Sequence, residues 1–170
     1  MKKLLLLILL FSSSLFYSQA LPSDFLIGEY EIITDNGVIG PDFGTENFET
    51  GMITVSGEGN ARTFDVGILP AFNSEIETVV LNFSQGRIQI GEISPGISCT
   101  AGISYIFSPT DYSDATPYNL NGSDEYFEVF YTEDIEGSCG GPFLSSFTIA
   151  KSNVGCYAPS NVQFSNPTAS

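Results

Sequence analysis

Apolar and polar residues alternate along short stretches of this chain, and turn-forming residues separate one stretch from the next. In GEYEIIT (28–34), Tyr30 and Ile32 alternate with glutamates, which is the pattern of a strand with one buried face. The same period of two recurs in ARTFDVGIL (61–69). EIETVVLNF (75–83) is instead β-branched at its centre, which is typical of a strand covered on both faces. These patterns predict β-strands.

About eight strands are predicted, at spacings of roughly 10–15 residues, and no segment has the period of a convincing amphipathic helix. The connections between them are rich in Gly, Pro, Asn and Asp, which are turn formers. The predicted strands lie at 28–34, 48–57, 61–69, 75–83, 87–93, 125–134 and 142–151, with two short strands around a bend at Ala101 and Gly102 within 97–109.

Strands joined in succession by short turns predict an all-β antiparallel domain. We expect an up-and-down meander that closes as a lipocalin-like barrel, with a β-sandwich as the alternative. The stretch IGEYEI (27–32) resembles the first strand of lipocalin-like barrels, which opens on a Gly-x-aromatic sequence. Tyr30 stands where those barrels usually carry tryptophan, and this departure leaves the sandwich open.

Residues 1–20 have the organisation of a secretory signal peptide. A basic start precedes an apolar run at 4–10, and Ser18 and Ala20 place small residues at the −3 and −1 positions of a cleavage site. The run is too short to span a bilayer well, and the absence of a nearby cysteine argues against a lipid anchor. We therefore expect a mature chain that begins at Leu21, is secreted or held at the cell surface, and does not insert in the membrane.

The charge of the expected mature chain is strongly negative. Loss of Lys2 and Lys3 leaves Arg62, Arg87 and Lys151 as its positively charged side chains, against 20 Asp and Glu residues. Such a surface repels phosphate backbones and anionic lipids, so nucleic acid and membrane partners are disfavoured. An extracellular glycan or protein is the partner class that remains, and we expect the domain to be a monomer.

Three cysteines are present, and an oxidising compartment favours pairing two of them. Cys99 and Cys139 both lie within the body of the predicted domain, so we expect a disulfide between them. On the chain-entropy model, closing that loop stabilises the fold by roughly 3–4 kcal/mol. Cys156 is left over beside the tail, and its partner is expected in sequence beyond residue 170.

The composition argues against most enzyme chemistry. The chain contains no histidine, which excludes Ser-His-Asp, Cys-His and His-ligated metal sites. A glycosidase that uses two carboxylates remains an alternative, because some of the 20 Asp and Glu residues will lie close together. The chain contains no tryptophan, however, to stack on a sugar ring. We therefore predict that the chain is not an enzyme and needs no cofactor.

The polar loop 110–125 is the best candidate for a binding site, with hard oxygen ligands that suit Ca²⁺. Its spacing matches no EF-hand, and an ordinary solvated loop is the alternative reading. The acidic turn at 133–136 is expected to keep the last strand pair from pairing edge to edge with another chain. The candidate calcium ligands are Asp111, Asp114, Asn119, Asn121, Asp124 and Glu125, and the candidate ligand contacts are Tyr112, Tyr118 and Tyr126.

Two stretches, LPSDFLIGEYEI (21–32) and YTEDIEGSCGGPFLSSFTIAK (131–151), resemble an N-terminal β-domain of secreted multidomain proteins from Bacteroidota, especially flavobacteria. The tail CYAPSNVQFSNPTAS (156–170) resembles the opening of a fibronectin type III module. These resemblances imply a β-domain at 21–152, followed at 153–170 by a linker and the truncated first strand of a fibronectin type III-like module. They supply no catalytic motif.

The sequence thus predicts a non-enzymatic exported β-module of a modular extracellular or cell-surface protein. It would act in ligand, glycan or protein contact, in adhesion or as a spacer, and would present loops such as 36–47 and 110–124. One alternative is a lipocalin-like barrel that carries a small apolar ligand, and another is an accessory domain of a secreted enzyme encoded downstream. A carrier needs an apolar cavity of several hundred Å³ between its strands, whereas a surface binder has a packed interior.

Overall fold

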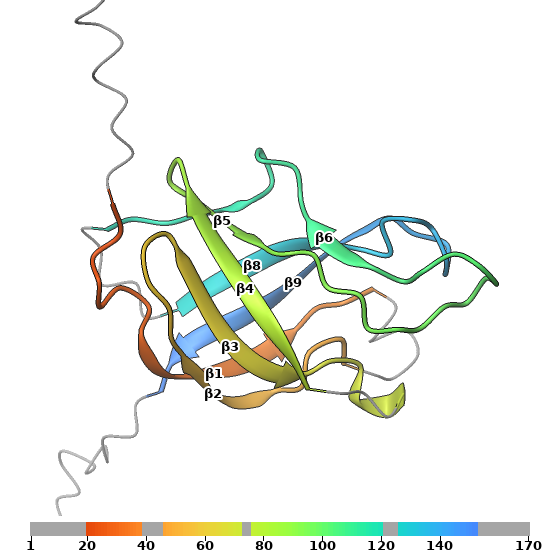
Figure 1. Ribbon diagram of the computed structural model, residues 1–170, viewed down its shortest axis with the longest axis horizontal. Helices are drawn as coiled ribbons and strands as arrows, with labels where there is room; N and C mark the ends of the chain where they lie inside the picture. Colours follow the sequence, from red (N-terminus) through yellow and green to blue (C-terminus); the bar gives the residue numbers. More distant parts are fainter. Residues whose placement is uncertain (1–19, 39–45, 73–75, 121–125, 153–170) are drawn as a thin grey trace, which may run out of the picture.

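The computed structural model describes residues 20–38, 46–72, 76–120 and 126–152, and the regular secondary structure of this part is β-strand apart from one short 3₁₀ helix (Figure 1). The all-β prediction is confirmed. The predicted signal peptide, apart from Ala20, and the predicted fibronectin-like tail at 153–170 with Cys156 lie outside the described residues. The elements are β1 (Gly28–Asp35), β2 (Gly51–Val55), β3 (Ala61–Gly67), the 3₁₀ helix η1 (Pro70–Phe72), β4 (Ile76–Ser84), β5 (Arg87–Ile90), β6 (Phe107–Pro109), β7 (Thr116–Pro117), β8 (Tyr126–Glu133) and β9 (Phe143–Lys151).

These strands form two antiparallel sheets, with strand orders β2-β1-β9-β8-β6 and β3-β4-β5-β7. Figure 1 shows β3 and β4 crossing over β8 and β9. Neither sheet closes into a barrel, so the lipocalin-like barrel prediction is wrong, and the arrangement is consistent with the β-sandwich alternative. The physical reason lies at the sheet edges, where single bridges such as Ser56–Thr63 and Ile93–Phe107 stand in place of continuous ladders.

The region between β5 and β6 departs most from the predicted strands. β5 ends at Ile90, and 97–109 contributes only the three residues of β6 in place of two strands. Its first part is a loop that one isolated bridge, Thr100–Ile103, folds back on itself. β5 and β6 accordingly belong to different sheets, and a single bridge, Ile93–Phe107, joins the segments around them.

Strand β1 lies between β2 and β9, and its alternation follows the prediction as far as Ile32. A register shift in its pairing with β9 then occurs between Ile32 and Thr34. As a result, Ile33 and Thr34 are both exposed, and Asp35 turns toward the interior. The bulge therefore places a carboxylate at the inner end of β1.

A buried arginine fastens the segment that precedes β1. Arg62 lies on the inward side of β3 beside Phe64 and is fully buried. Its guanidinium donates hydrogen bonds to the backbone oxygens of Phe25 at 2.6 Å and Pro22 at 3.0 Å. Neutral carbonyl groups satisfy this buried charge, so residues 21–27 are held across one end of the core.

Aromatic rings fill the space between the two sheets. Phe48, from the connection between β1 and β2, is fully buried, and its ring centroid lies 4.6 Å from that of Phe147 and 5.2 Å from that of Tyr131. Phe107 packs on the same group at 5.3 to 5.4 Å. Phe64 of β3 reaches this group from the other sheet, with its ring centroid 6.3 Å from that of Phe147, so aromatic packing joins the two sheets.

We predict that Phe48→Ala lowers the free energy of unfolding by about 3–5 kcal/mol, because it leaves a cavity where four rings meet. Urea denaturation with the disulfide intact measures the loss. Leu144→Ala truncates a side chain on β9 that is 52% exposed and serves as the control, with an expected loss below about 1 kcal/mol. Equal losses in the two variants would contradict the placement of Phe48 in the core.

Candidate functional site

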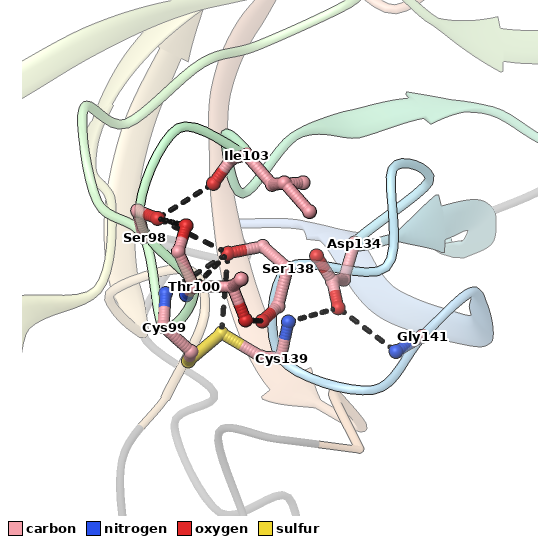
Figure 2. The surroundings of a disulfide bond; sticks show 8 residues. All are labelled: Ser98, Cys99, Thr100, Ile103, Asp134, Ser138, Cys139 and Gly141. Atoms are coloured by element: carbon pink, nitrogen blue, oxygen red, sulfur yellow. Dashed lines mark hydrogen bonds between the residues drawn. A yellow bond between two sulfur atoms is a disulfide. The ribbon is translucent and has the colours of Figure 1, made fainter.

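The predicted disulfide between Cys99 and Cys139 is present, with the two Cα atoms 5.0 Å apart, and it joins loop 97–105 to loop 134–141 (Figure 2). Ser138 reinforces this junction with hydrogen bonds of its own. Its hydroxyl oxygen accepts from the backbone N–H of Cys99 at 2.9 Å, and its carbonyl accepts from the Thr100 hydroxyl at 2.7 Å. The two loops are therefore held by a covalent bond and a hydrogen-bond network together.

Asp134 organises the second of these loops from inside. Its side chain is fully buried, and its Oδ2 atom accepts from the backbone N–H groups of Cys139 at 2.7 Å and Gly141 at 2.8 Å (Figure 2). A side chain at position 141 would collide with Asp134, because a Cβ built there lies 2.6 Å from the Asp134 carbonyl oxygen. The conformation of this loop thus depends on the buried Asp134 side chain and on the absence of a side chain at Gly141.

The turn at 133–136 therefore does not have the role expected from sequence alone. Glu133 and Asp134 are both fully buried, so they cannot repel an approaching strand from the surface. Ile135 and Glu136 are the exposed residues of this turn. The first two acids instead act as internal acceptors that fix the neighbouring loops.

A buried polar cluster lies beside this turn, where β1 and β8 end. The side-chain amide of Asn47 donates to Glu133 Oε2 at 2.7 Å and to the Tyr131 hydroxyl oxygen at 2.9 Å. The Ser145 hydroxyl donates to the same Glu133 oxygen at 2.5 Å, and the Tyr131 hydroxyl reaches Asp35 Oδ1 at 3.5 Å. Two carboxylates thus share one network of neutral donors.

These carboxylates hold both ends of loop 36–47. Asp35 accepts from the backbone N–H of Gly37 at 3.2 Å at one end, and from those of Asn47 and Phe48 at the other, the latter at 3.0 Å. Glu133 Oε2 also accepts from the backbone N–H of Val38 at 3.1 Å. Residues 39–45, the middle of this loop, lie outside the described residues. The base of the loop is therefore closed by a carboxylate clamp.

Burial shifts the protonation equilibria of the cluster. Desolvation raises the pKa of Asp35, hydrogen bonds from Phe48, Asn47 and Gly37 oppose the rise, and the charge of Glu133 adds to it. Desolvation also raises the pKa of Tyr131 well above its ordinary value, with further contributions from the nearby carboxylates. The tyrosine is therefore a neutral hydrogen-bond donor at physiological pH.

Tyr105 connects this cluster to the disulfide. Its side chain is fully buried, and burial followed by the charge of Glu133 raises its pKa, so the phenol stays neutral. The hydroxyl lies close enough to Glu133 to respond to its charge, but it makes no hydrogen bond of normal geometry within the described part of the chain. Tyr105 is also part of the lining of a pocket beside Cys99 and Cys139.

The predicted calcium ligands are only partly within the described residues. Asp111, Asp114 and Asn119 are exposed, and the Asp111 carbonyl accepts from the backbone N–H of Asp114 at 2.9 Å in a local turn. Asn121, Asp124 and Glu125 lie outside the described residues. Among the residues that are described, no three Cys, Asp or Glu side chains gather into a group that could hold a metal ion. Calcium binding by this loop stays a prediction.

The three predicted ligand-contact tyrosines lie in different surroundings. Tyr118 is half-buried, and its ring packs against Phe83 at 5.2 Å in the core. Tyr112 is 47% exposed, donates to the Gln85 carbonyl at 2.7 Å and lies under the Arg87 guanidinium. Tyr126, at the start of β8, is 67% exposed. Tyr112 and Tyr126 are thus accessible to a partner, whereas Tyr118 supports the core.

Sequence reasoning did not find the carboxylate clamp, because Asp35 and Asn47 stand in turn-rich stretches where polar residues are usually solvated. One signal was present in β8. Its inward positions are Phe127, Val129 and Tyr131, and the same period of two reaches Glu133. A polar residue that continues the buried side of a strand marks an internal acceptor or donor.

Compared with known proteins, the chain matches no family model, no curated protein and no solved structure. Within the ranges that the structure describes, no helix is long and apolar enough to cross a membrane. The geometry of the described residues is therefore the basis for any functional assignment.

We predict that Glu133→Ala destabilises the protein by about 1–3 kcal/mol or more, because Asn47, Ser145 and the Val38 N–H group lose a shared buried acceptor. Chemical denaturation measures the change. Glu31→Ala removes an exposed carboxylate from β1 and is expected to change stability by less than about 0.5 kcal/mol. A Glu133→Ala protein as stable as the Glu31→Ala protein would be inconsistent with the clamp.

A second prediction concerns pH. Because the folded-state pKa of Asp35 is raised above 3.8, the folded protein binds its proton more tightly than the unfolded chain. The contribution of Asp35 to stability is therefore fully present below pH 3.8 and decreases as pH rises through the folded-state pKa. The unfolding free energy of the parent protein minus that of Asp35→Asn should therefore fall as pH rises over that range. If the parent protein instead gained stability relative to Asp35→Asn as pH rises, the pKa of Asp35 in the folded protein would be lowered.

Proposed function

We propose that this domain is a non-catalytic binding module of an exported protein, which contacts an extracellular protein or glycan through the loops at one end of its sheets. The observation that carries the proposal is the way those loops are fixed. Asp35 and Glu133 hold loop 36–47 at its base, and the disulfide with Ser138 and Asp134 holds the other two loops. Fixing the described bases of the loops before binding reduces the entropy that is lost when a partner is bound.

The packing between the sheets favours a surface binder over a lipocalin-like carrier. Phe48, Phe107, Tyr131 and Phe147 occupy the centre of the molecule, where a carrier would hold its ligand. The buried carboxylates likewise suit a scaffold rather than acid–base catalysis, because protein donors surround them.

Export is supported by two independent features. The Cys99–Cys139 disulfide fits an oxidising compartment, and residues 1–20 have the pattern of a cleavable signal peptide. On this proposal the domain stands at the front of a modular extracellular protein, and the stretch at 153–170 leads into a fibronectin type III-like module. The acid-rich composition favours neutral or basic partner surfaces over anionic ones.

The proposal can be tested by presenting the chain from residue 21 to 170 to a glycan array and to a display library of random peptides. At least one class of probe should be retained. Asp35→Asn, which weakens the clamp under loop 36–47, should reduce the affinity for that probe by about tenfold, or ~1.4 kcal/mol. Glu31→Gln, an exposed change on the same strand, is the matched control and should leave affinity unchanged.

Two results would overturn the proposal. One is retention of neither glycans nor peptides by a chain whose near-ultraviolet circular dichroism shows a folded aromatic core. The other is equal binding by the parent, Asp35→Asn and Glu31→Gln proteins, which would place the contact away from the clamped loops.

A further inference from the structure

An apolar pocket of about 500 Å³ lies beside the disulfide, between η1 and the two cross-linked loops. Leu69 and Phe72 form one wall, and Ile97, Tyr105 and the two half-cystines form the others. This volume is within the range of small-molecule sites in proteins. The pocket lies outside the aromatic core between the sheets, so it is distinct from the lumen expected of a lipocalin-like carrier.

Each wall of the pocket is fixed by contacts that do not depend on a ligand. The Leu69 N–H group donates to the Asn47 carbonyl at 2.8 Å, and the Phe72 N–H group donates to the Leu69 carbonyl at 2.9 Å. Across the pocket, the Tyr105 N–H group donates to the Ile97 carbonyl at 3.0 Å. The Cys99–Cys139 bond closes the remaining side. The cavity is therefore preformed, and filling it orders few additional groups.

The chemistry of the lining selects for an uncharged ligand. None of the described lining residues carries a charge, and Ser98, which supplies a hydroxyl, already donates to the Ile103 carbonyl at 2.6 Å. The phenol of Tyr105 stays neutral beside Glu133. A carboxylate or phosphate would leave water without a compensating partner and would approach a strongly acidic protein.

The same lining favours an aromatic ligand over a linear aliphatic one. Phe72 supplies an exposed ring at the rim, the fully buried Tyr105 supplies a second ring to the lining, and the disulfide supplies two sulfur atoms. Rings pack edge to face on other rings, and sulfur makes favourable contacts with ring edges. Phe72 is 52% exposed at the rim, so burying it on binding removes apolar surface from water.

We infer that this pocket is a binding site for a small uncharged aromatic molecule. The site shares the disulfide-linked loops with the proposed surface contact, but none of its described lining residues belongs to loop 36–47 or to the clamp formed by Asp35 and Glu133. A molecule seated there contacts η1 and both disulfide-linked loops at once, so it ties the three segments together.

The inference is tested with N-phenyl-1-naphthylamine, a neutral aromatic dye whose fluorescence rises in apolar surroundings, and the chain from residue 21 to 170. We expect saturable binding of one dye per chain. Phe72→Ala, which removes the rim ring, should weaken binding by about tenfold, and Ile97→Trp, which fills the cavity, should abolish it. Leu144→Ala is the matched control, because Leu144 is also 52% exposed but lies on β9 away from the pocket.

Reduction of the disulfide gives an independent readout. A bound dye should slow the cleavage of Cys99–Cys139 by dithiothreitol, because it covers the wall that the bond forms, and Phe72→Ala should remove that protection. Thermal melting of each variant establishes that it is folded. The inference is overturned if folded Phe72→Ala and Leu144→Ala proteins bind the dye equally, if folded parent protein binds none, or if the dye leaves the reduction rate unchanged. The proposed surface contact is judged separately by Asp35→Asn, because Asp35 is not among the described lining residues of the pocket.

Discussion

Two carboxylates, the half-buried Asp35 and the fully buried Glu133, organise the loop bases at one end of this molecule. Every hydrogen bond described for them comes from a neutral donor, either a backbone N–H group or the side chain of Asn47, Ser145 or Tyr131. Removing such charges from water is costly, and at Asp35 the donors offset that cost only in part, because desolvation still raises its pKa. The loop bases are therefore fixed by hydrogen bonds to the carboxylates as well as by the apolar packing of Phe48.

A positively charged residue, Arg62, plays a similar part elsewhere in the fold. Arg62 is buried beside Phe64 and satisfied by carbonyl groups of the segment before β1. In both places a charged side chain takes an inward position and gathers backbone groups that would otherwise be unpaired. The protein thus uses buried charge to secure irregular segments against its sheets.

The period-two pattern predicted most of the strands, because alternation reports directly which face of a strand is buried. It predicted neither the bulge after Ile32 nor the loop at 97–105, since both depend on how distant segments meet. The same limit explains why the barrel prediction was wrong. Barrel closure depends on pairing between the edge strands of the sheet, and the pattern of a single strand does not encode that pairing. Glu133 and Arg62 were readable in principle, because each continues the inward side of an alternating strand. Their partners were not, because backbone donors have no sequence signature.

The pairing of β1 with β9 has a consequence for how the domain stands relative to anything attached to it. Gly28 and Lys151 lie at the same end of this antiparallel pair, where the Ser152 N–H group donates to the Glu29 carbonyl at 3.1 Å. The clamped loop follows β1 and the cross-linked loop precedes β9, so both lie at the far end (Figure 1). Ser152, the last described residue, therefore lies at the pole opposite the bases of these loops, so a module joined after it would be attached away from them.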